Sequence, residues 1–208
     1  MSYSSEQIAI MDSIIARYPR KRSAIMPLLH FVQSISGYVT SEGIEAIAEK
    51  LELSTAEVTA VSTFYTQYKS EPVGEYHVGI CTNTLCAVMG GDAIFEAVSD
   101  HLGIANDETT KDGKVSLERI ECNAACDYAP VVMVNWEFFD NQTVQSVKDL
   151  VDGARTGNPP APTRGPKTLR TWKENSAVLA GLSDGLSGEG PAAGTPSLLG
   201  LKLSKEGK

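Results

Sequence analysis

Four cysteines, standing as two close pairs, most constrain how this chain folds. Four residues separate Cys81 from Cys86, three separate Cys122 from Cys126, and 35 lie between the pairs. A secreted disulfide scaffold uses more cysteines over a shorter chain than the four found in these 208 residues. We therefore expect the fold to bring both pairs to one point, where the thiolates hold a metal or carry out redox chemistry.

The amino-acid composition excludes two classes of binding protein. Lys and Arg number 18 against 26 Asp and Glu, which gives a net charge of −8. Nucleic acids and anionic membrane surfaces both attract basic proteins. No run approaches the ~18 apolar residues that a membrane-spanning helix needs, and residues 1–7 lack the layout of a secretory signal. We expect an intracellular chain that does not bind nucleic acid.

The first 70 residues predict a small four-helix bundle. Apolar residues recur at the three-four spacing of helices, over about 5–18, 23–35, 44–51 and 54–68. Ser54 and Glu57 form a capping box, in which each side chain accepts a hydrogen bond from the other residue's backbone N–H. Pro19 ends the first helix, and Gly37 closes the second.

Residues 71–157 predict an α/β domain. The order is strand, helix, strand, strand, strand, helix, over about 76–81, 85–101, 115–121, 131–134, 136–139 and 144–157. Cys81 ends the first strand, whereas Cys122 and Cys126 flank a loop between later strands. Loops at the same end of a sheet can meet, so this order supports convergence of the four thiols.

The tail over 158–208 has a different composition. Its 51 residues contain 8 Gly and 6 Pro, which is typical of low-complexity chain, so we expect it to be largely extended. Apolar residues such as Trp172 and Leu198 are nevertheless spaced along it. An alternative is that the tail orders by wrapping around a partner.

The cysteine spacing favours an iron–sulfur cluster over a single ion. Zinc ribbons use two-residue gaps that wrap tightly around one ion, whereas gaps of four and three suit ligands spread over two irons. The intervening residues are mostly short, so backbone N–H groups can approach bridging sulfides. Spacing thus favours a [2Fe–2S] cluster, and it leaves structural zinc and unrelated reduced thiols open.

Two motifs carry a family resemblance. Cys-Thr-Asn-Thr-Leu-Cys at 81–86 and Glu-Cys-Asn-Ala-Ala-Cys-Asp-Tyr-Ala-Pro-Val-Val at 121–132 resemble the cluster motifs of the thioredoxin-like [2Fe–2S] ferredoxin subunit of respiratory complex I, the family of NADH-quinone oxidoreductase E subunits. Residues 22–24, 27–29, 37–39 and 63–65 resemble that family's N-terminal helical region, so the resemblance covers about 1–157. The second motif departs from the usual Cys-Leu-Gly-Ala-Cys, because Asn123 and Ala124 replace Leu and Gly. Ala124 places a methyl group where Gly permits any backbone conformation.

The resemblance implies a fold, a cofactor and partners. The fold is an N-terminal helical bundle, a thioredoxin-like α/β domain and the extended tail. One [2Fe–2S] cluster is held by Cys81, Cys86, Cys122 and Cys126, and no residue of this chain is catalytic on its own. The partners are the flavoprotein subunit, which binds NADH and FMN, and the large iron–sulfur subunit. The chain exchanges single electrons with the FMN as part of a quinone-reducing enzyme, peripheral to the cytoplasmic side of the plasma membrane.

Two other functions stay open at this point. The first is the equivalent diaphorase subunit of an NAD-linked hydrogenase or formate dehydrogenase, and the second is a zinc-stabilised interaction module. Residues 71–157 contain 15 Asp and Glu against 5 Lys and Arg. Negative charge raises the cost of adding an electron to an anionic cluster, which predicts a low reduction potential unless solvent screens the carboxylates.

Overall fold

Two compact units make up the part of the chain that the computed structural model describes, residues 3–186, 188–190 and 194–207. The first contains the described residues up to Val73 together with Arg170–Asp184. The second contains Gly74–Leu169 and the described residues from Gly185 onward. Part of the tail thus belongs to the first unit. None of the helices within the described residues is long and apolar enough to cross a membrane.

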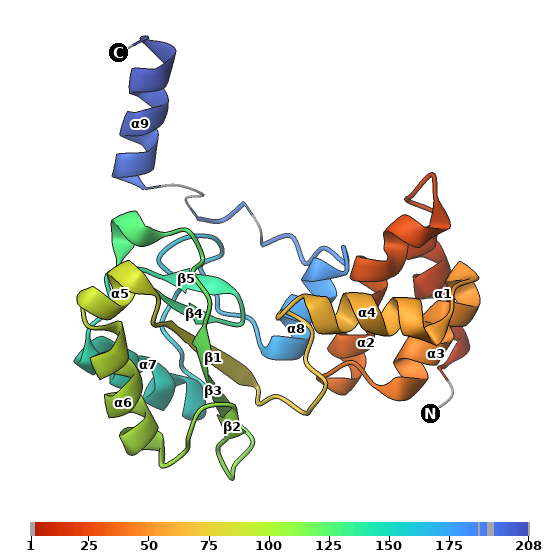
Figure 1. The fold of residues 1–208 in the computed structure, drawn as a ribbon, viewed down its shortest axis with the longest axis horizontal. Coiled ribbons are helices and arrows are strands. Elements are labelled where there is room, and N and C mark those ends of the chain that lie inside the picture. Colours follow the sequence, from red (N-terminus) through yellow and green to blue (C-terminus); the bar gives the residue numbers. More distant parts are fainter. Residues whose placement is uncertain (1–2, 187, 191–193, 208) are drawn as a thin grey trace. The chain divides into compact units, whose positions relative to one another are not determined.

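The first unit is helical. It consists of α1 (Ser5–Ile15), α2 (Ile25–Ser36), α3 (Ser41–Leu51), α4 (Thr55–Phe64) and α8 (Trp172–Leu179), with a 3₁₀ turn at Lys21–Ala24 (Figure 1). Both hydrogen bonds of the capping box between Ser54 and Glu57 are present, and Gly37 ends α2 with a φ of 86°. Helix α4 ends earlier than expected, because the backbone at Tyr65 is extended.

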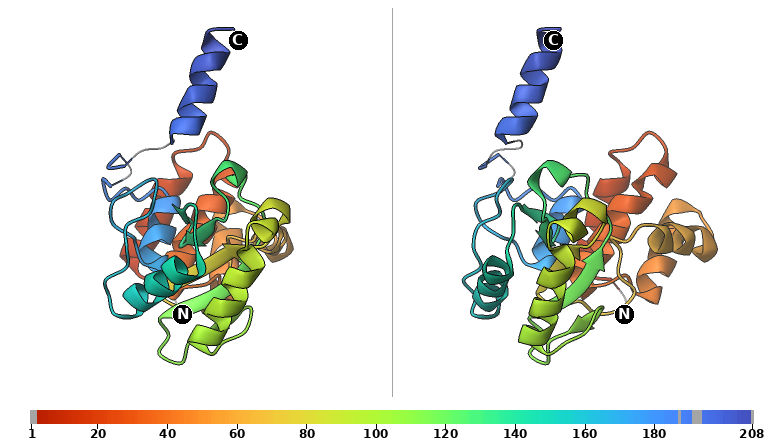
Figure 2. Two further views of the ribbon diagram at one scale, coloured as in Figure 1. Left: turned by 90° about the vertical axis from the view of Figure 1, so that its left-hand side faces the viewer. Right: turned by 60° about the vertical axis from the view of Figure 1, so that its left-hand side comes forward.

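Two segments of the tail, which we expected to be largely extended, are helical. Thr171 and Glu174 form a capping box that starts α8, and α8 packs along α2 (Figures 1 and 2). Trp172 is 1 % exposed, and its indole N–H donates to the carbonyl oxygen of Gly37 at 2.7 Å. A second tail helix, α9, spans Thr195–Lys205. Composition averaged over 51 residues concealed these helices. Because α8 joins the four N-terminal helices in the first unit, the specific four-helix bundle is not confirmed.

The second unit is built on a five-stranded sheet. Its strands are β1 (Tyr76–Cys81), β2 (Glu108–Thr109), β3 (Val115–Ile120), β4 (Val132–Val134) and β5 (Glu137–Phe139), in the order β2-β3-β1-β4-β5. Strands β1 and β3 are parallel, and the other neighbours are antiparallel. Helices α6 (Gly91–Leu102) and α7 (Val144–Arg155) pack against each other and against an apolar core on one face of the sheet.

The helix expected over 85–101 is two helices. Helix α5 (Thr84–Val88) ends just before Gly90, whose φ of 109° is left-handed, and α6 begins at the next residue. Glycine adopts this conformation without the steric penalty of a side chain, so Gly90 redirects the chain between the helices. The break confines Cys86 to the short helix α5, close to the end of β1.

Candidate metal centre

The sheet topology places both cysteine pairs at one end of the parallel strands β1 and β3. Cys81 is the last residue of β1 and lies opposite Ile120, the last residue of the parallel strand β3. Cys122 follows two residues later, so the first cysteine loop (residues 81–86) and the second cysteine loop (residues 122–126) leave the same end of the sheet. The sequence predicted this meeting of the loops.

The four thiols stand as two pairs in different surroundings. Cys81 and Cys86 are buried, at 2 % and 3 % exposure, among Ile120, Ala125, Val131 and Met133. Cys122 and Cys126 are exposed, with their Sγ atoms 3.8 Å apart. All four belong to the candidate set that the sequence indicated.

Burial and neighbouring thiols oppose ionisation at this centre. Burial raises the pKa of Cys81 to about 11, and the neighbouring Cys86 and Cys122 thiols add to the rise. The adjacent Cys122 is the main cause of the raised pKa of Cys126, and Cys81 contributes as well. The two pairs are therefore close enough to affect each other's charge. A bound cation would reverse this balance, because metal ligation deprotonates thiols.

Backbone N–H groups reach the first sulfur of each pair. The N–H of Asn83 hydrogen-bonds Cys81 and works against the rise in its pKa. The N–H of Ala124 donates to the Sγ of Cys122 at 3.4 Å. Ala124 has a φ of 55°, a left-handed conformation that its methyl group makes costly. Alanine in place of the family's glycine therefore raises the conformational energy of this loop, although the N–H of Ala124 still reaches the sulfur of Cys122.

Gly91 is a position beside the candidate centre that sequence reasoning missed. A Cβ atom at Gly91 would lie 2.5 Å from the carbonyl oxygen of Cys81 and 2.8 Å from that of Cys86. Helix α6 therefore begins in direct contact with the backbone of the first cysteine loop. The Gly90-Gly91 pair signals a helix break, whereas this contact depends on tertiary packing.

Arg164 is a second position that sequence reasoning missed. Its guanidinium binds both carboxylate oxygens of Asp140, at 2.8 and 2.9 Å, and lies 4.1 Å from the ring centre of Phe138 and 5.0 Å from that of Tyr128. Tyr128 lies two residues after Cys126. A segment expected to be free tail thus packs behind the second cysteine loop, and no local sequence pattern indicates it.

The donor set fits a two-iron cluster. Across the described residues, no three Cys, His, Asp or Glu side chains gather closely enough to hold one metal ion. A [2Fe–2S] cluster takes four thiolates, two on each iron, so its ligands form pairs. The arrangement of Cys81 with Cys86 and of Cys122 with Cys126 has this pairing.

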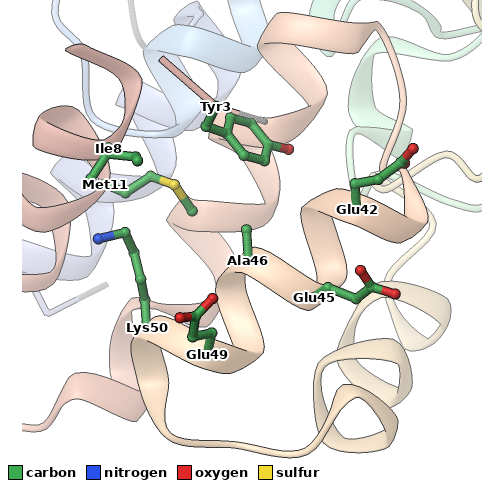
Figure 3. A pocket seen from close by; sticks show the side chains of 8 residues that line it. All are labelled: Tyr3, Ile8, Met11, Glu42, Glu45, Ala46, Glu49 and Lys50. Atoms are coloured by element: carbon green, nitrogen blue, oxygen red, sulfur yellow. The ribbon is translucent and has the colours of Figure 1, made fainter. Parts of the chain in front are cut away.

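A separate hollow lies between α1 and α3 (Figure 3). It measures about 580 Å³, and its lining includes Ile8, Met11 and the acidic side chains of Glu42, Glu45 and Glu49. Lys50 at its rim pairs with Asp12 at 2.5 Å. The three glutamates do not converge as metal ligands.

Fold and thiols together define a ferredoxin of the thioredoxin-like type. The sequence profile of the thioredoxin-like [2Fe-2S] ferredoxins matches residues 11–155, and the chain belongs to that family. The NADH-quinone oxidoreductase E subunit of Mycobacterium tuberculosis strain H37Rv is 54% identical over 210 residues, covering 99% of this chain and 83% of the relative. The corresponding E subunit of Rickettsia bellii is 38% identical over 157 residues, covering 74% of this chain and 94% of the relative. These matches place the chain among the E subunits of NADH-quinone oxidoreductases.

A solved structure shares the fold. The crystal structure of an NAD+-reducing [NiFe]-hydrogenase in its air-oxidized state aligns with a TM-score of 0.56 and 16% identity, over 64% of this chain and 23% of the hydrogenase chain. This likeness concerns the fold alone. The family expectation, the thioredoxin-like fold and the [2Fe–2S] cofactor are confirmed by the family match and by the two bacterial relatives.

Proposed function

We propose that Cys81, Cys86, Cys122 and Cys126 hold the [2Fe–2S] cluster of an electron-transfer subunit in the NADH-oxidising part of a quinone-reducing respiratory complex. The observation that carries this proposal is the presence of two thiol pairs at one edge of the sheet. When bound, such a cluster takes up and gives back one electron at a time. The chain is a subunit of an oxidoreductase and needs no general acid or base of its own.

The residues around the thiols hold the ligands and limit the access of water. Ile120, Val131 and Met133 pack against Cys81 and Cys86 in a small apolar cluster. The N–H groups of Asn83 and Ala124 stabilise negative charge on the sulfurs. Cys81 and Cys86 are buried on one side of the centre, whereas Cys122 and Cys126 are exposed on the other.

An uncharged surface on α5 supports a protein partner at this edge. Residues 79–91 contain no charged side chain, although the surrounding segment is strongly acidic. Leu85, Val88 and Met89 are exposed there, Val88 to 79 %. Apolar residues without charge are typical of the centre of a protein interface. We assign this surface to the flavoprotein that binds NADH and FMN, with the large iron–sulfur subunit as a further partner and the complex at the cytoplasmic side of the plasma membrane.

Metal analysis tests the cluster assignment. Anaerobically purified protein is expected to contain two irons and two labile sulfides per chain and to give the EPR signal of a reduced [2Fe–2S] cluster with dithionite. Each single Cys→Ala substitution should lower the iron content by at least about half, because each ligand is needed to hold its iron. A colourless chain with one zinc would instead support a zinc-stabilised module.

Co-purification tests the partner assignment. Val88→Asp places a charge in the uncharged surface and should abolish recovery of flavin with the tagged chain. Ala105→Asp, at an exposed position just before β2, is the matched control and should leave recovery unchanged. Recovery of hydrogenase or formate dehydrogenase subunits with the flavoprotein would identify the alternative parent complex.

A redox titration tests the low reduction potential expected of the cluster, and a value well above that of NADH would contradict it.

A further inference from the structure

Asn83 connects the two cysteine loops. It occupies the N-cap position of α5, where an Asn side chain ordinarily accepts a hydrogen bond from the first turn of the helix. That capping bond is not made here. The side-chain Nδ2 instead donates to the carbonyl oxygen of Ile120 at 3.2 Å, across 37 residues of sequence. The side chain of Asn83 therefore makes a long-range hydrogen bond in place of the local capping bond.

The two ends of this connection both lie next to ligands. The backbone N–H of Asn83 acts on Cys81 and lowers the pKa of its thiol, against the larger effect of burial. Ile120 is the last residue of β3, it lies opposite Cys81 in the register, and it precedes Cys122 by two residues. One residue thus contacts the first thiol pair through its backbone and the chain that leads to the second pair through its side chain.

We propose that Asn83 is a positioning residue for the cluster. Its side chain fixes the spacing between the first and second cysteine loops, and the same bond holds its own N–H toward the sulfur of Cys81. N–H groups directed at ligand sulfur stabilise the more negative, reduced state of a cluster and raise its potential. Asn83 thereby influences both retention of the cluster and its reduction potential. The inference rests on the proposed function only in that the four thiols hold the cluster.

Asn123 provides a matched control within the same centre. Its Nδ2 also donates to a backbone carbonyl oxygen, that of Glu121, at 3.1 Å. This bond spans two residues and stays within the chain around the second cysteine loop. Asn123 and Asn83 are therefore the same residue type, both half-buried, with bonds of similar length. They differ in whether the bond joins the two loops.

The experiment compares Asn83→Ser with Asn123→Ser in the full chain loaded with its cluster. The serine hydroxyl is too short to reach Ile120, so Asn83→Ser should release iron to a chelator about tenfold faster, as outer-shell ligand supports do when removed. Its midpoint potential should move to a more negative value, with shifted EPR g values. Asn123→Ser should match the unmodified chain in all three measurements. Asn83→Asp, which keeps the side-chain shape but loses the donor, should also release iron faster.

Three other results are possible, and each would overturn a stated part of this proposal. Unchanged release, potential and g values in both Asn83 variants, with two irons in the unmodified chain, would overturn the positioning role and leave the cluster assignment intact. Equal shifts in Asn83→Ser and Asn123→Ser would show that bridging the loops has no special effect. Absence of iron from the unmodified chain would overturn the proposed function and the positioning role together.

Discussion

The two cysteine loops supply the same number of thiols on very different supports. In the first, Cys81 ends a central strand, Cys86 lies in a helix, and both are buried. In the second, Cys122 and Cys126 are exposed, and Ala124 between them has a left-handed backbone. Regular structure and apolar packing hold the first pair, whereas local turns hold the second. The fold itself therefore sets the position of the first pair, whereas the second pair depends on the geometry of an exposed loop.

Thiol alkylation gives the largest expected effect. In cluster-free protein, Cys122 and Cys126 should react with iodoacetamide about a hundredfold faster than Cys81 and Cys86, because reagent reaches buried thiols only after local opening. Peptide mass spectrometry over a time course measures the four rates separately. Denaturation in guanidinium is the control and should bring the rates together. Equal rates in the folded chain would remove the distinction between the loops.

The pH dependence of Cys81 gives the next effect. Its pKa of about 11 means that little thiolate is present near neutral pH, so its alkylation rate should rise about tenfold per pH unit up to about 11. The folded pKa exceeds the reference value of 9.0, so the buried neutral thiol stabilises the fold fully below pH 9.0. That contribution is lost as the pH rises through about 11.

Denaturant unfolding of cluster-free protein measures this linkage. The midpoint should fall above pH 9.0, and Cys81→Ala should fall less over the same range because it lacks the titrating group. A Cys81 rate that levels off near neutral pH would contradict the raised pKa.

Gly91 tests the rigidity of the first loop. Gly91→Ala puts a methyl carbon 2.5 Å from the Cys81 carbonyl oxygen and 2.8 Å from that of Cys86, so backbone must move. We expect a loss of stability of about 2–3 kcal/mol, as for overpacked cores, and a marked fall in iron per chain. Thermal unfolding and iron analysis measure both. Gly188→Ala, where a Cβ meets open space, is the control. Full iron content in Gly91→Ala would show that the first loop tolerates movement.

Local sequence patterns predicted the parts of the fold that depend on a few adjacent residues. The capping box at Ser54 and Glu57 and the pairing of β4 with β5 follow from neighbouring residues, and the structure contains both. The thiol spacing predicted that Cys81 and Cys122 meet, because strand ends at one edge of a sheet are close. These features need only local energetics and one topological rule.

Long-range contacts explain what the sequence did not predict. Trp172 donates a hydrogen bond to the carbonyl oxygen of Gly37, which lies 135 residues away in the sequence. Asn83 donates to the carbonyl oxygen of Ile120, at a separation of 37 residues. Gly91 is required by two carbonyl oxygens that approach it only in the folded chain. Neither composition nor periodicity specifies such a partner, since both average over neighbours in sequence. The candidate ligands were therefore predictable, whereas the residues that support them were not.

Ala124 gives the smallest expected effect and tests the second loop. Ala124→Gly relieves a left-handed alanine, which costs about 1–2 kcal/mol, and adds unfolded-state entropy worth about 0.5–1 kcal/mol. We expect a net stabilisation of about 0.5 kcal/mol in denaturant unfolding of cluster-free protein. Ala125→Gly is the control at the next residue, which is buried with a φ of −108°. It should destabilise by about 1 kcal/mol, because it loses a buried methyl and gains only entropy when unfolded. Opposite signs at adjacent alanines would locate the strain in the second loop at one residue, and equal signs would refute it.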